Sequence, residues 1–378
     1  MKYFIKKLVK MDVPEFIKFL NQSIERLRAL QFLKEEISES KNAGSKARQD
    51  IECILERRYK SCFILKKTRS PDVRQKIGFL FSMYTIKAMI FFIKNRRRNI
   101  IIQYPFYINR LYRLGLQHMI KRNNSVFFVH DIDSIRSCAH DSFIKECILL
   151  NNTYIVILHN DNMLQFMKNH GVKASCISLE LFDYLLPGDT PKQQYFLGYE
   201  IVFAGNLAKS EFIESIPHKK ICLQFNLFGN GLSDKARNNP NIFYQGSFTP
   251  DEIPYKLRGS FGLVWDGNSL DTCSGDFGEY LKLNNPHKLS LYIAAGIPVI
   301  VWKQAAIAQL VDKYNIGFCV DSIQDISSKI NSLNATDYSK YLENIKKLQK
   351  LVITGYFTNR ALDQVEKIMG ENLLHKES

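Results

Sequence analysis

The fold is decided by residues 261–302, which read FGLVWDGNSLDTCSGDFGEYLKLNNPHKLSLYIAAGIPVIVW. Two short apolar runs, FGLVW and IPVIVW, flank a polar loop with several glycines and an apolar stretch that begins at a proline. Short runs of β-branched and aromatic residues predict buried strands, and the longer apolar stretch between them predicts a helix. We therefore expect a strand, a long loop, a helix and a second strand, which together form one βαβ unit.

This unit places charged side chains where a strand ends and a helix begins. The loop starts at Asp266, and Lys288 falls in the first turn of the expected helix. Pro286 suits the first helical position, with Asn284 or Asn285 as the N-cap. Unpaired backbone N–H groups at a helix N-terminus bind anionic oxygens, and ligands of parallel sheets bind at the carboxyl ends of the strands. The pattern predicts a site for a phosphorylated sugar, with an ordinary capped helix and a surface lysine as the alternative.

The remaining sequence repeats the alternation of strand and helix. SVFFVH and TYIVILH are strong strand candidates before the middle of the chain, and YEIVFA and KICLQFNLFG follow it. Between the two groups lies LPGDTPKQQ, residues 186–194, whose proline, glycine and polar residues are typical of a linker. We predict an α/β fold with two consecutive Rossmann-like domains that face a central cleft.

The predicted domain boundaries follow from this alternation. Residues 1–27 form an N-terminal extension with an amphipathic helix, and residues 28–190 form the first Rossmann-like domain. Residues 191–353 form the second. Residues 354–378 form a C-terminal helix that packs back toward the first domain.

Positive charge is concentrated in the first third of the chain. The formal net charge is +15, yet residues 1–122 contain 28 Lys+Arg against 10 Asp+Glu, and the other residues are slightly acidic. A basic surface suits a nucleic acid, an anionic membrane or a phosphorylated substrate. A generally lysine-rich, solvated surface is the other explanation.

The cysteines and the apolar stretches of the sequence bear on the cellular compartment of the protein. The eight cysteines are scattered without metal-ligand spacing, which is typical of thiols in a reducing cytoplasm. No secretory signal is evident. The most apolar window, residues 77–93, contains Lys87 and is short for a membrane span. We expect a buried or interfacial helix there, and the arginines at positions 96, 97 and 98 would also suit a membrane surface.

The stretch NPHKLSLYIAAGIPVI, residues 285–300, resembles the nucleotide-sugar site of GT-B glycosyltransferases. The shared pattern is a proline, a lysine, a tyrosine, small residues and Gly-x-Pro-Val. One position departs from it, because Leu291 stands where many GT-B enzymes have a glutamate that binds ribose. Ribose recognition is therefore expected to come from other residues.

A narrower resemblance covers roughly residues 28–370. The stretch that begins at Phe261 and ends at Lys288 is similar to bacterial β-1,6-galactofuranosyltransferases of O-antigen synthesis, and more weakly to glucosyltransferases that modify serine-rich adhesins. The same resemblance continues in FFVHDIDSIR (127–136), IVFAGNLAKSEFI (201–213), LFG (227–229), YQGSF (244–248) and AGSKARQDI (43–51).

The resemblance implies a GT-B fold, in which residues 28–190 bind the acceptor and residues 191–353 bind the nucleotide sugar. It also implies a set of residues that bind the donor. By itself, AGNLAKS (204–210) is a weak glycine-turn signal after a strand, with an ordinary turn as the alternative. Within the family pattern it is expected to open a helix and to border the donor diphosphate. The donor-binding residues that we expect are Lys288, His287, Asn285, Ser290, Gly205, Asn206, Lys209, Asp266 and Gly267.

Three residues are candidates for the general base. His130 and Asp131 follow a strand, and inverting transfer needs a base that takes the proton of the acceptor hydroxyl. Asp276 is a third candidate, and the sequence does not choose among them. The tripeptide Asp131-Ile132-Asp133 also fits the metal-binding DxD of GT-A enzymes, but two Rossmann-like lobes favour GT-B, which needs no metal. Structural roles for these residues are the alternative.

Further residues are expected to contact the sugar or the acceptor. In the acidic loop these are Asp271 and Glu279, because carboxylates accept hydrogen bonds from sugar hydroxyls, although a solvated acidic loop is the plainer explanation. In NAGSKAR they are Gly44, Ser45 and Lys46, since a glycine turn after the first strand can bring backbone N–H groups to a ligand.

Together these features imply an inverting GT-B hexosyltransferase of surface polysaccharide (O-antigen, lipopolysaccharide) biosynthesis, with UDP-galactofuranose as donor and no metal or other cofactor. The expected acceptor is a polyprenyl-diphosphate-linked oligosaccharide, so that a cytoplasmic enzyme would sit peripherally on the anionic inner face of the membrane. A homo-oligomer is compatible with the sequence. The alternatives are a UDP-glucose-type transferase that acts on a glycoprotein, and a non-enzymatic basic protein that binds membrane or nucleic acid, although no nucleic-acid motif is present.

Overall fold

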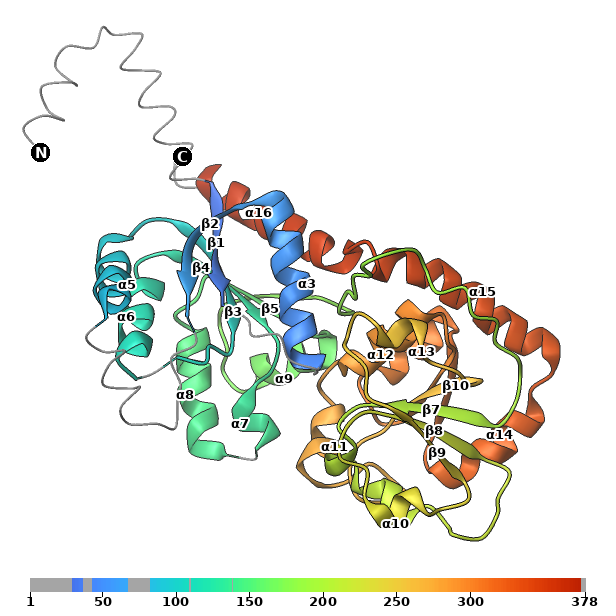
Figure 1. The fold of residues 1–378 in the computed structure, drawn as a ribbon. Helices are drawn as coiled ribbons and strands as arrows, with labels where there is room; N and C mark the ends of the chain where they lie inside the picture. The colour runs from blue at the N-terminus through green and yellow to red at the C-terminus, as the bar shows by residue number, and fades with distance from the viewer. Residues whose placement is uncertain (1–28, 37–42, 67–81, 109, 138, 375–378) are drawn as a thin grey trace, which may run out of the picture.

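The computed structural model describes residues 29–36, 43–66, 82–108, 110–137 and 139–374 (Figure 1). The predicted N-terminal amphipathic helix, residues 1–27, lies outside the described residues. The helix that we expect in the apolar window of residues 77–93 is described only in part, as a helix that begins at Met83.

The N-terminal lobe is built on a parallel sheet of six strands in the order β2-β1-β3-β4-β5-β6. The chain adds strands on one side of β1 and then on the other, so the strand order reverses between β1 and β3. The strands are β1 (Leu30–Glu35), β2 (Lys60–Leu65), β3 (Asn99–Tyr104), β4 (Asn124–Val129), β5 (Ile155–Leu158) and β6 (Ser175–Ser178).

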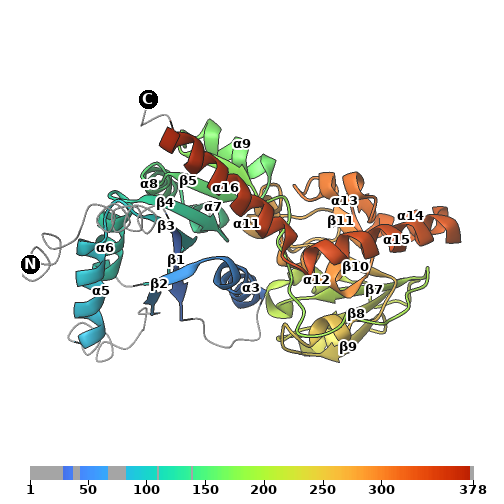
Figure 2. The same cartoon turned by 90° about the horizontal axis from the view of Figure 1, so that it is seen from above.

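Helices cover both faces of this sheet. The helix α3 packs on one face, where Ile51 and Leu55 share a core with strand residues, and α5, α6, α8 and α9 cover the other. Figure 2 shows α5 and α6 side by side, on the side of the lobe away from the C-terminal lobe. The helices are α3 (Ala43–Arg58), α5 (Met83–Lys94), α6 (Arg110–Ile120), α7 (Asp133–Arg136), α8 (His140–Leu150) and α9 (Asp161–Asn169).

The C-terminal lobe contains a second parallel sheet in the order β12-β11-β10-β7-β8-β9. Counted from its own first strand, this is the 3-2-1-4-5-6 order of dinucleotide-binding folds, with the reversal between β7 and β10. The strands are β7 (Glu200–Ala204), β8 (Gln224–Phe228), β9 (Ile242–Gly246), β10 (Phe261–Val264), β11 (Val299–Trp302) and β12 (Gly317–Val320). The helices are α10 (Asp234–Arg237), α11 (Gly275–Leu281), α12 (His287–Ala295), α13 (Ala308–Tyr314), α14 (Ile326–Ser332) and α15 (Ala335–Val352).

One sequence expectation in this lobe is wrong. The stretch after Gly205 was expected to open a helix, but it forms two short 3₁₀ turns, η1 (Leu207–Lys209) and η2 (Glu211–Ser215). The backbone N–H of Leu207 donates to Asn230 O at 2.9 Å, and that of Phe212 donates to Gly267 O at 3.1 Å. In an α-helix the N–H of Phe212 would donate four residues back, so its bond to Gly267 O interrupts the i→i−4 ladder.

The last helix, α16 (Tyr356–Leu374), returns to the N-terminal lobe. The chain turns at Gly355, whose φ of 82° lies in the left-handed region that favours glycine. Asp183 then accepts hydrogen bonds from Phe357 N at 3.2 Å and Thr358 N at 2.7 Å, which satisfies donors in the first turn of α16. The helix packs against α3 and β6, so that it closes the same face of the sheet as α3.

The two lobes share one apolar core. A single cluster of buried residues runs from Phe32 and Ile101 in the N-terminal sheet to Val301 in the C-terminal sheet, and it includes Leu362 of α16. The predicted fold class, two Rossmann-like lobes of α/β type, is confirmed. None of the helices in the described part of the chain is both long enough and apolar enough to cross a membrane.

Candidate functional site

The reversal point between β7 and β10 is occupied by Lys288. Its ammonium lies 2.7 Å from Asp266 Oδ1 and 4.8 Å from the centre of the Phe203 ring. Gly205 ends the neighbouring strand, and a Cβ at that position would lie 3.0 Å from Lys288 Cε. Glycine therefore leaves the room that the lysine side chain uses. Three of the predicted donor-binding residues, Lys288, Asp266 and Gly205, are brought together here.

The helix α12 starts at the same place, with its backbone donors unblocked by a side chain. Pro286 is the N-cap residue, at φ −62° and ψ 131°, and no side chain caps the helix. The expectation that Pro286 would be the first helical residue, with an asparagine cap, is therefore wrong. The N–H of Leu289 donates to Pro286 O at 3.0 Å, but those of His287 and Lys288 have no hydrogen-bond partner among the described residues. The positive end of the helix dipole and these two donors suit an anion, with the Lys288 side chain beside them.

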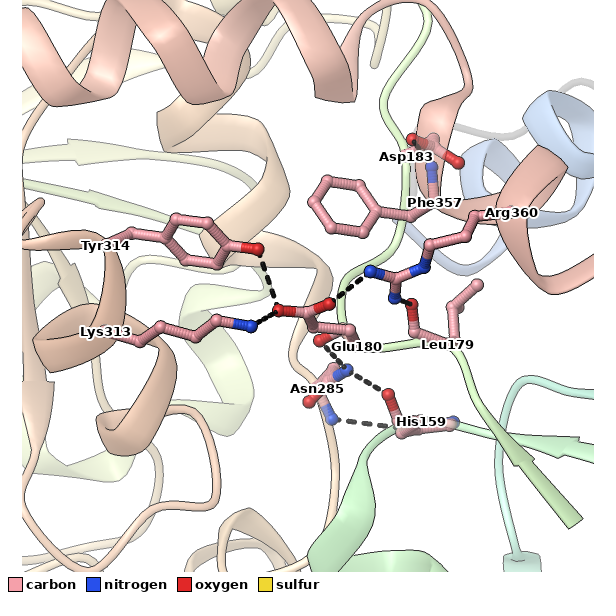
Figure 3. Close-up of polar contacts among 9 residues, drawn as sticks. All are labelled: His159, Leu179, Glu180, Asp183, Asn285, Lys313, Tyr314, Phe357 and Arg360. Carbon is pink, nitrogen blue, oxygen red and sulfur yellow. Dashed lines mark hydrogen bonds and ion pairs between the residues drawn. The ribbon is translucent and has the colours of Figure 1, made fainter.

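Asn285 fastens the start of α12 to the N-terminal lobe instead of capping it. Its Nδ2 group donates to His159 O at 2.7 Å and to Glu180 O at 3.0 Å, and its backbone N–H donates to His159 Nδ1 at 3.0 Å (Figure 3). Its Oδ1 accepts from Asn160 Nδ2 at 2.7 Å. The Oδ1 atom is the acceptor that an N-cap would need, and Asn160 already occupies it, which explains why the sequence-based cap is absent.

Glu180, just after β6, joins three parts of the molecule. Its carboxylate accepts a hydrogen bond from the Tyr314 hydroxyl at 2.7 Å and pairs with Lys313, both on α13. The other oxygen lies 2.6 Å from Arg360 Nη1 on α16 (Figure 3). Hydrogen bonds from Lys313, Tyr314 and Arg360 outweigh burial and lower the pKa of Glu180. No sequence signal pointed to this residue, because its partners lie far along the chain.

Two of the predicted bases follow β4. Burial raises the pKa of Asp131 to about 6, although Arg136, 3.0 Å away, opposes the shift. His130 is buried, and its Nε2 lies 2.7 Å from Gln103 Oε1. Burial, with Arg48 nearby, lowers the pKa of His130 well below its usual value, so the imidazole is neutral. These two neighbours in the sequence therefore have different partners, Arg136 for the Asp131 carboxyl and Gln103 for the His130 imidazole.

His130 also belongs to a group of three histidines around the ring of Phe182. The ring centres of His130, His159 and His287 lie 5.9, 4.9 and 6.1 Å from that of Phe182. Burial lowers the pKa values of His159 and His287 to about 4. His287, a predicted donor-binding residue, stacks on Tyr184 and has both ring nitrogens buried without a hydrogen-bond partner among the described residues.

Lys209 lies beside an aromatic ring that bridges the lobes. Its ammonium lies 5.7 Å from the centre of Phe277, and the Arg136 guanidinium of the N-terminal lobe lies at the same distance from that ring. Asn206 is exposed next to Lys209. Two cations from different lobes therefore gather on one side chain of α11, which sequence reasoning did not single out.

The acidic loop is held compactly by Gly267. A Cβ there would lie 2.5 Å from Ser274 O, and its φ of 113° favours glycine. Asp271 accepts a hydrogen bond from Gln324 Nε2 at 2.7 Å, and Glu279 pairs with Lys282 three residues later. Asp276 is exposed in the first turn of α11.

The predicted residues of NAGSKAR lie at the start of α3, which contacts α12 of the other lobe. Gly44 and Ser45 fall in its first turn. The Lys46 ammonium is buried, 2.8 Å from Asp50 and 2.7 Å from Asp251 of the C-terminal lobe. Lys46 thus forms an ionic contact between the lobes.

Two positions on α12 face the interior. Ser290 donates a hydrogen bond to Phe182 O at 2.7 Å, so this predicted donor-binding hydroxyl contacts the N-terminal lobe. Leu291, where related enzymes have the ribose-binding glutamate, packs in the core. Within the described ranges, no group of three or more His, Cys, Asp or Glu side chains is arranged to hold a metal ion.

Comparison with known proteins identifies both lobes. Residues 32–181 match the family "Glucosyltransferase 3-like, N-terminal domain", and residues 201–365 match "Glucosyltransferase 3-like, C-terminal domain". The chain is 30% identical over 336 residues to β-1,6-galactofuranosyltransferase WbbI of Escherichia coli (strain K12), covering 86% of this chain and 94% of that protein. It is 28% identical to glucosyltransferase 3 of Streptococcus gordonii, over 65% of this chain and 71% of that protein.

A solved structure supports the fold. The Anabaena protein HepE, in complex with UDP-glucose, superimposes with a TM-score of 0.54 over 91% of this chain and 99% of its own, at 12% identity. The predicted resemblance is confirmed, since two family domains and a relative at 30% identity cover most of the chain. The chain belongs to the glucosyltransferase 3-like family and is a glycosyltransferase with a GT-B fold.

Proposed function

We propose that this enzyme transfers galactofuranose from UDP-galactofuranose to a glycan acceptor, with inversion at the anomeric carbon. The relative that carries the sugar assignment is the E. coli protein named β-1,6-galactofuranosyltransferase. The structural observation that carries the donor site is Lys288, placed with the uncapped start of α12 at the β7–β10 reversal point.

The donor diphosphate is proposed to replace Asp266 as the partner of Lys288. The β-phosphate oxygens would accept hydrogen bonds from the first N–H groups of α12, and Lys288 would supply the positive charge. Negative charge grows on these oxygens as the bond to the anomeric carbon breaks, so the same contacts stabilise the transition state more than the ground state. Lys209 and Asn206 border the same strand end.

Asp131 is the base that we propose. In the reaction, an acceptor oxygen forms a bond to the anomeric carbon, the carbon–oxygen bond to UDP breaks, and the acceptor proton passes to the carboxylate. A pKa of about 6 leaves Asp131 largely ionised at neutral pH and still basic enough to take a proton. His130 is a weaker base, because burial disfavours its protonated form. Asp276, exposed on α11, stays the alternative base from the C-terminal lobe.

No divalent metal is needed in this scheme, because α12 and two lysines supply the positive charge. We further propose a lipid-linked oligosaccharide acceptor of surface polysaccharide synthesis, cytoplasmic location and peripheral association with an anionic membrane. Asp271, Glu279, Gly44, Ser45 and Lys46 remain proposed contacts of sugar or acceptor. Glucose transfer is the second candidate, because the Streptococcus gordonii relative is named glucosyltransferase 3.

The decisive experiment offers purified enzyme UDP-galactofuranose or UDP-glucose with polyprenyl-diphosphate-linked oligosaccharides and follows the products by mass spectrometry. We expect turnover with the galactofuranose donor that is unchanged by EDTA. Turnover with UDP-glucose alone would assign the second candidate. Loss of activity in EDTA that manganese restores would contradict the metal-independent scheme.

A further inference from the structure

The helix α5 exposes a continuous row of apolar side chains. Met83, Ile86, Ile90 and Ile93 are 66, 49, 45 and 56% exposed. Their spacing of three, four and three residues places them on one side of the helix. The opposite side, with Phe92 fully buried, packs against the lobe. We call these four residues the apolar row.

The stretch of sequence that contains the apolar row is strongly basic. From Met83 to His130 the sequence has nine Lys+Arg and no Asp or Glu. Lys87 and Lys94 are exposed on α5 itself, and Arg96 is exposed just after it. Among the described residues, none of these three cations is paired with a carboxylate. The neighbouring helix α6 adds the exposed side chain of Leu114.

We propose that the apolar row and its basic border form the surface by which the enzyme docks on an anionic lipid bilayer. Shallow insertion would remove the row from water, and the lysines and arginine would meet the negative surface potential of the lipids. A second copy of the chain is a poorer partner. Although the 3-4-3 spacing suits helix pairing, it would bring Lys87 and Lys94 of two copies together with no acid to offset them.

The position of α5 relative to the site fits this assignment, which rests on the proposed membrane-bound acceptor. Tyr84 anchors the start of α5 at the carboxyl end of β2, since its hydroxyl accepts from Lys66 N at 2.8 Å and donates to Ile64 O at 3.0 Å. His130 and Asp131 follow β4 at the same edge of the sheet, because all its strands are parallel. The first turn of α5 therefore lies at the edge where the proposed acceptor reacts, and the rest of the helix runs back toward the start of β3.

The test measures, by flotation, how much full-length enzyme binds to lipid vesicles. Vesicles of 30% phosphatidylglycerol in phosphatidylcholine are compared with vesicles of pure phosphatidylcholine. Ile86→Ser/Ile90→Ser is expected to lower partition into the anionic vesicles at least about tenfold. Lys87→Glu/Lys94→Glu is expected to abolish the preference for anionic over neutral vesicles, and salt should weaken it in the wild type.

The matched control is Ile144→Ser/Ile148→Ser on α8. These isoleucines are 49 and 59% exposed, but Asp141 and Glu146 share their helix, so vesicle binding should not change. Turnover of a short water-soluble acceptor should also be unchanged by Ile86→Ser/Ile90→Ser. Equal wild-type binding to both vesicle types, or a fall from oligomer to monomer in the variant, would overturn the proposal. Flotation needs no sugar transfer, so failure of the galactofuranose assignment would be seen separately.

Discussion

At the scale of single residues, three neighbours fix the position of the Lys288 side chain. Its ammonium pairs with Asp266 and lies over the face of Phe203, while the gap left by Gly205 gives its stem room. In this arrangement the lysine is positioned without donor, so little side-chain entropy remains to be lost when a diphosphate displaces Asp266.

Replacing Lys288 by alanine should lower kcat/KM at least about a hundredfold, because a charged contact to the leaving group is removed. Lys303→Ala is the control, since Lys303 also pairs with an aspartate, Asp321 at 3.3 Å, but both side chains are exposed. Steady-state kinetics with saturating acceptor measures the effect. Near-normal activity of Lys288→Ala would remove this residue from the diphosphate site.

The pKa of Asp131, raised to about 6 by burial, predicts the acid limb of the pH profile. The base must be ionised, so kcat/KM should fall about tenfold per pH unit below about 6 and level off above it. Asp131→Asn should remove this limb together with most of the activity. The control variant Asp133→Asn, two residues away, should keep both the acid limb and the activity. If Asp131→Asn retains the limb, Asp276 becomes the preferred base.

At the scale of elements, the segment after β6 ties α13 and α16 to the loop that starts α12. Glu180 contacts all three of these elements, and its own backbone is in the left-handed conformation, with φ 76°. A residue with a side chain adopts that region at a cost of about 1–2 kcal/mol, which the ion pairs offset here. Since the pKa of Glu180 is lowered, this contribution is present at neutral pH and is lost only as the pH falls below the usual glutamate range.

Substitutions at Glu180 should therefore reverse the usual order of stability, in which an alanine variant is more stable than a glycine variant. Both variants lose the ion pairs and should be less stable than the wild type, but Glu180→Gly should be more stable than Glu180→Ala by about 1 kcal/mol, because glycine adopts positive φ freely. Urea unfolding measures the difference. At Glu343, in the middle of α15 and paired with Lys347, alanine should be the more stable residue. The same order at both positions would contradict a strained backbone at Glu180.

The elements also show where sequence reasoning succeeds and where it stops. The buried strands β4, β5, β7 and β11 were predictable because each is a short apolar run that needs no information from elsewhere. The 3₁₀ turns after Gly205 were not, since Gly267 O takes the N–H of Phe212 that an α-helix would use. The cap at Asn285 failed for a similar reason, because Asn160 of the N-terminal lobe occupies its side-chain oxygen.

At the scale of the whole molecule, the convergence of Lys288, Asp266 and Gly205 followed from topology, because parallel strands end at one edge on either side of the order reversal. The contacts between the lobes were beyond prediction. Lys46, which stays a proposed contact of the sugar or the acceptor, is paired in the structure with Asp50 and with Asp251 of the other lobe. Such pairs depend on how two sheets are placed, and local pattern carries no information about that placement.

The shared core predicts that a destabilising substitution in α16 also destabilises the N-terminal lobe. Leu362 is fully buried between α16 and that lobe, so Leu362→Ala should lower stability by about 2–5 kcal/mol. Gln364→Ala, on the exposed side of the same helix, should change little. Hydrogen exchange should show faster opening of α3 and β6 in Leu362→Ala. Faster exchange confined to the C-terminal lobe would contradict the shared core.

The return of α16 sets an order of events during synthesis. The strands of the N-terminal lobe leave the ribosome first, but Phe357 and Leu362, which complete one face of their sheet, are made only after the entire C-terminal lobe. At 5–20 residues per second the interval lasts about 10–35 s. Part of the apolar face of the nascent N-terminal lobe, beside α3, thus stays uncovered through that interval, so the first lobe to be made is among the last parts to mature.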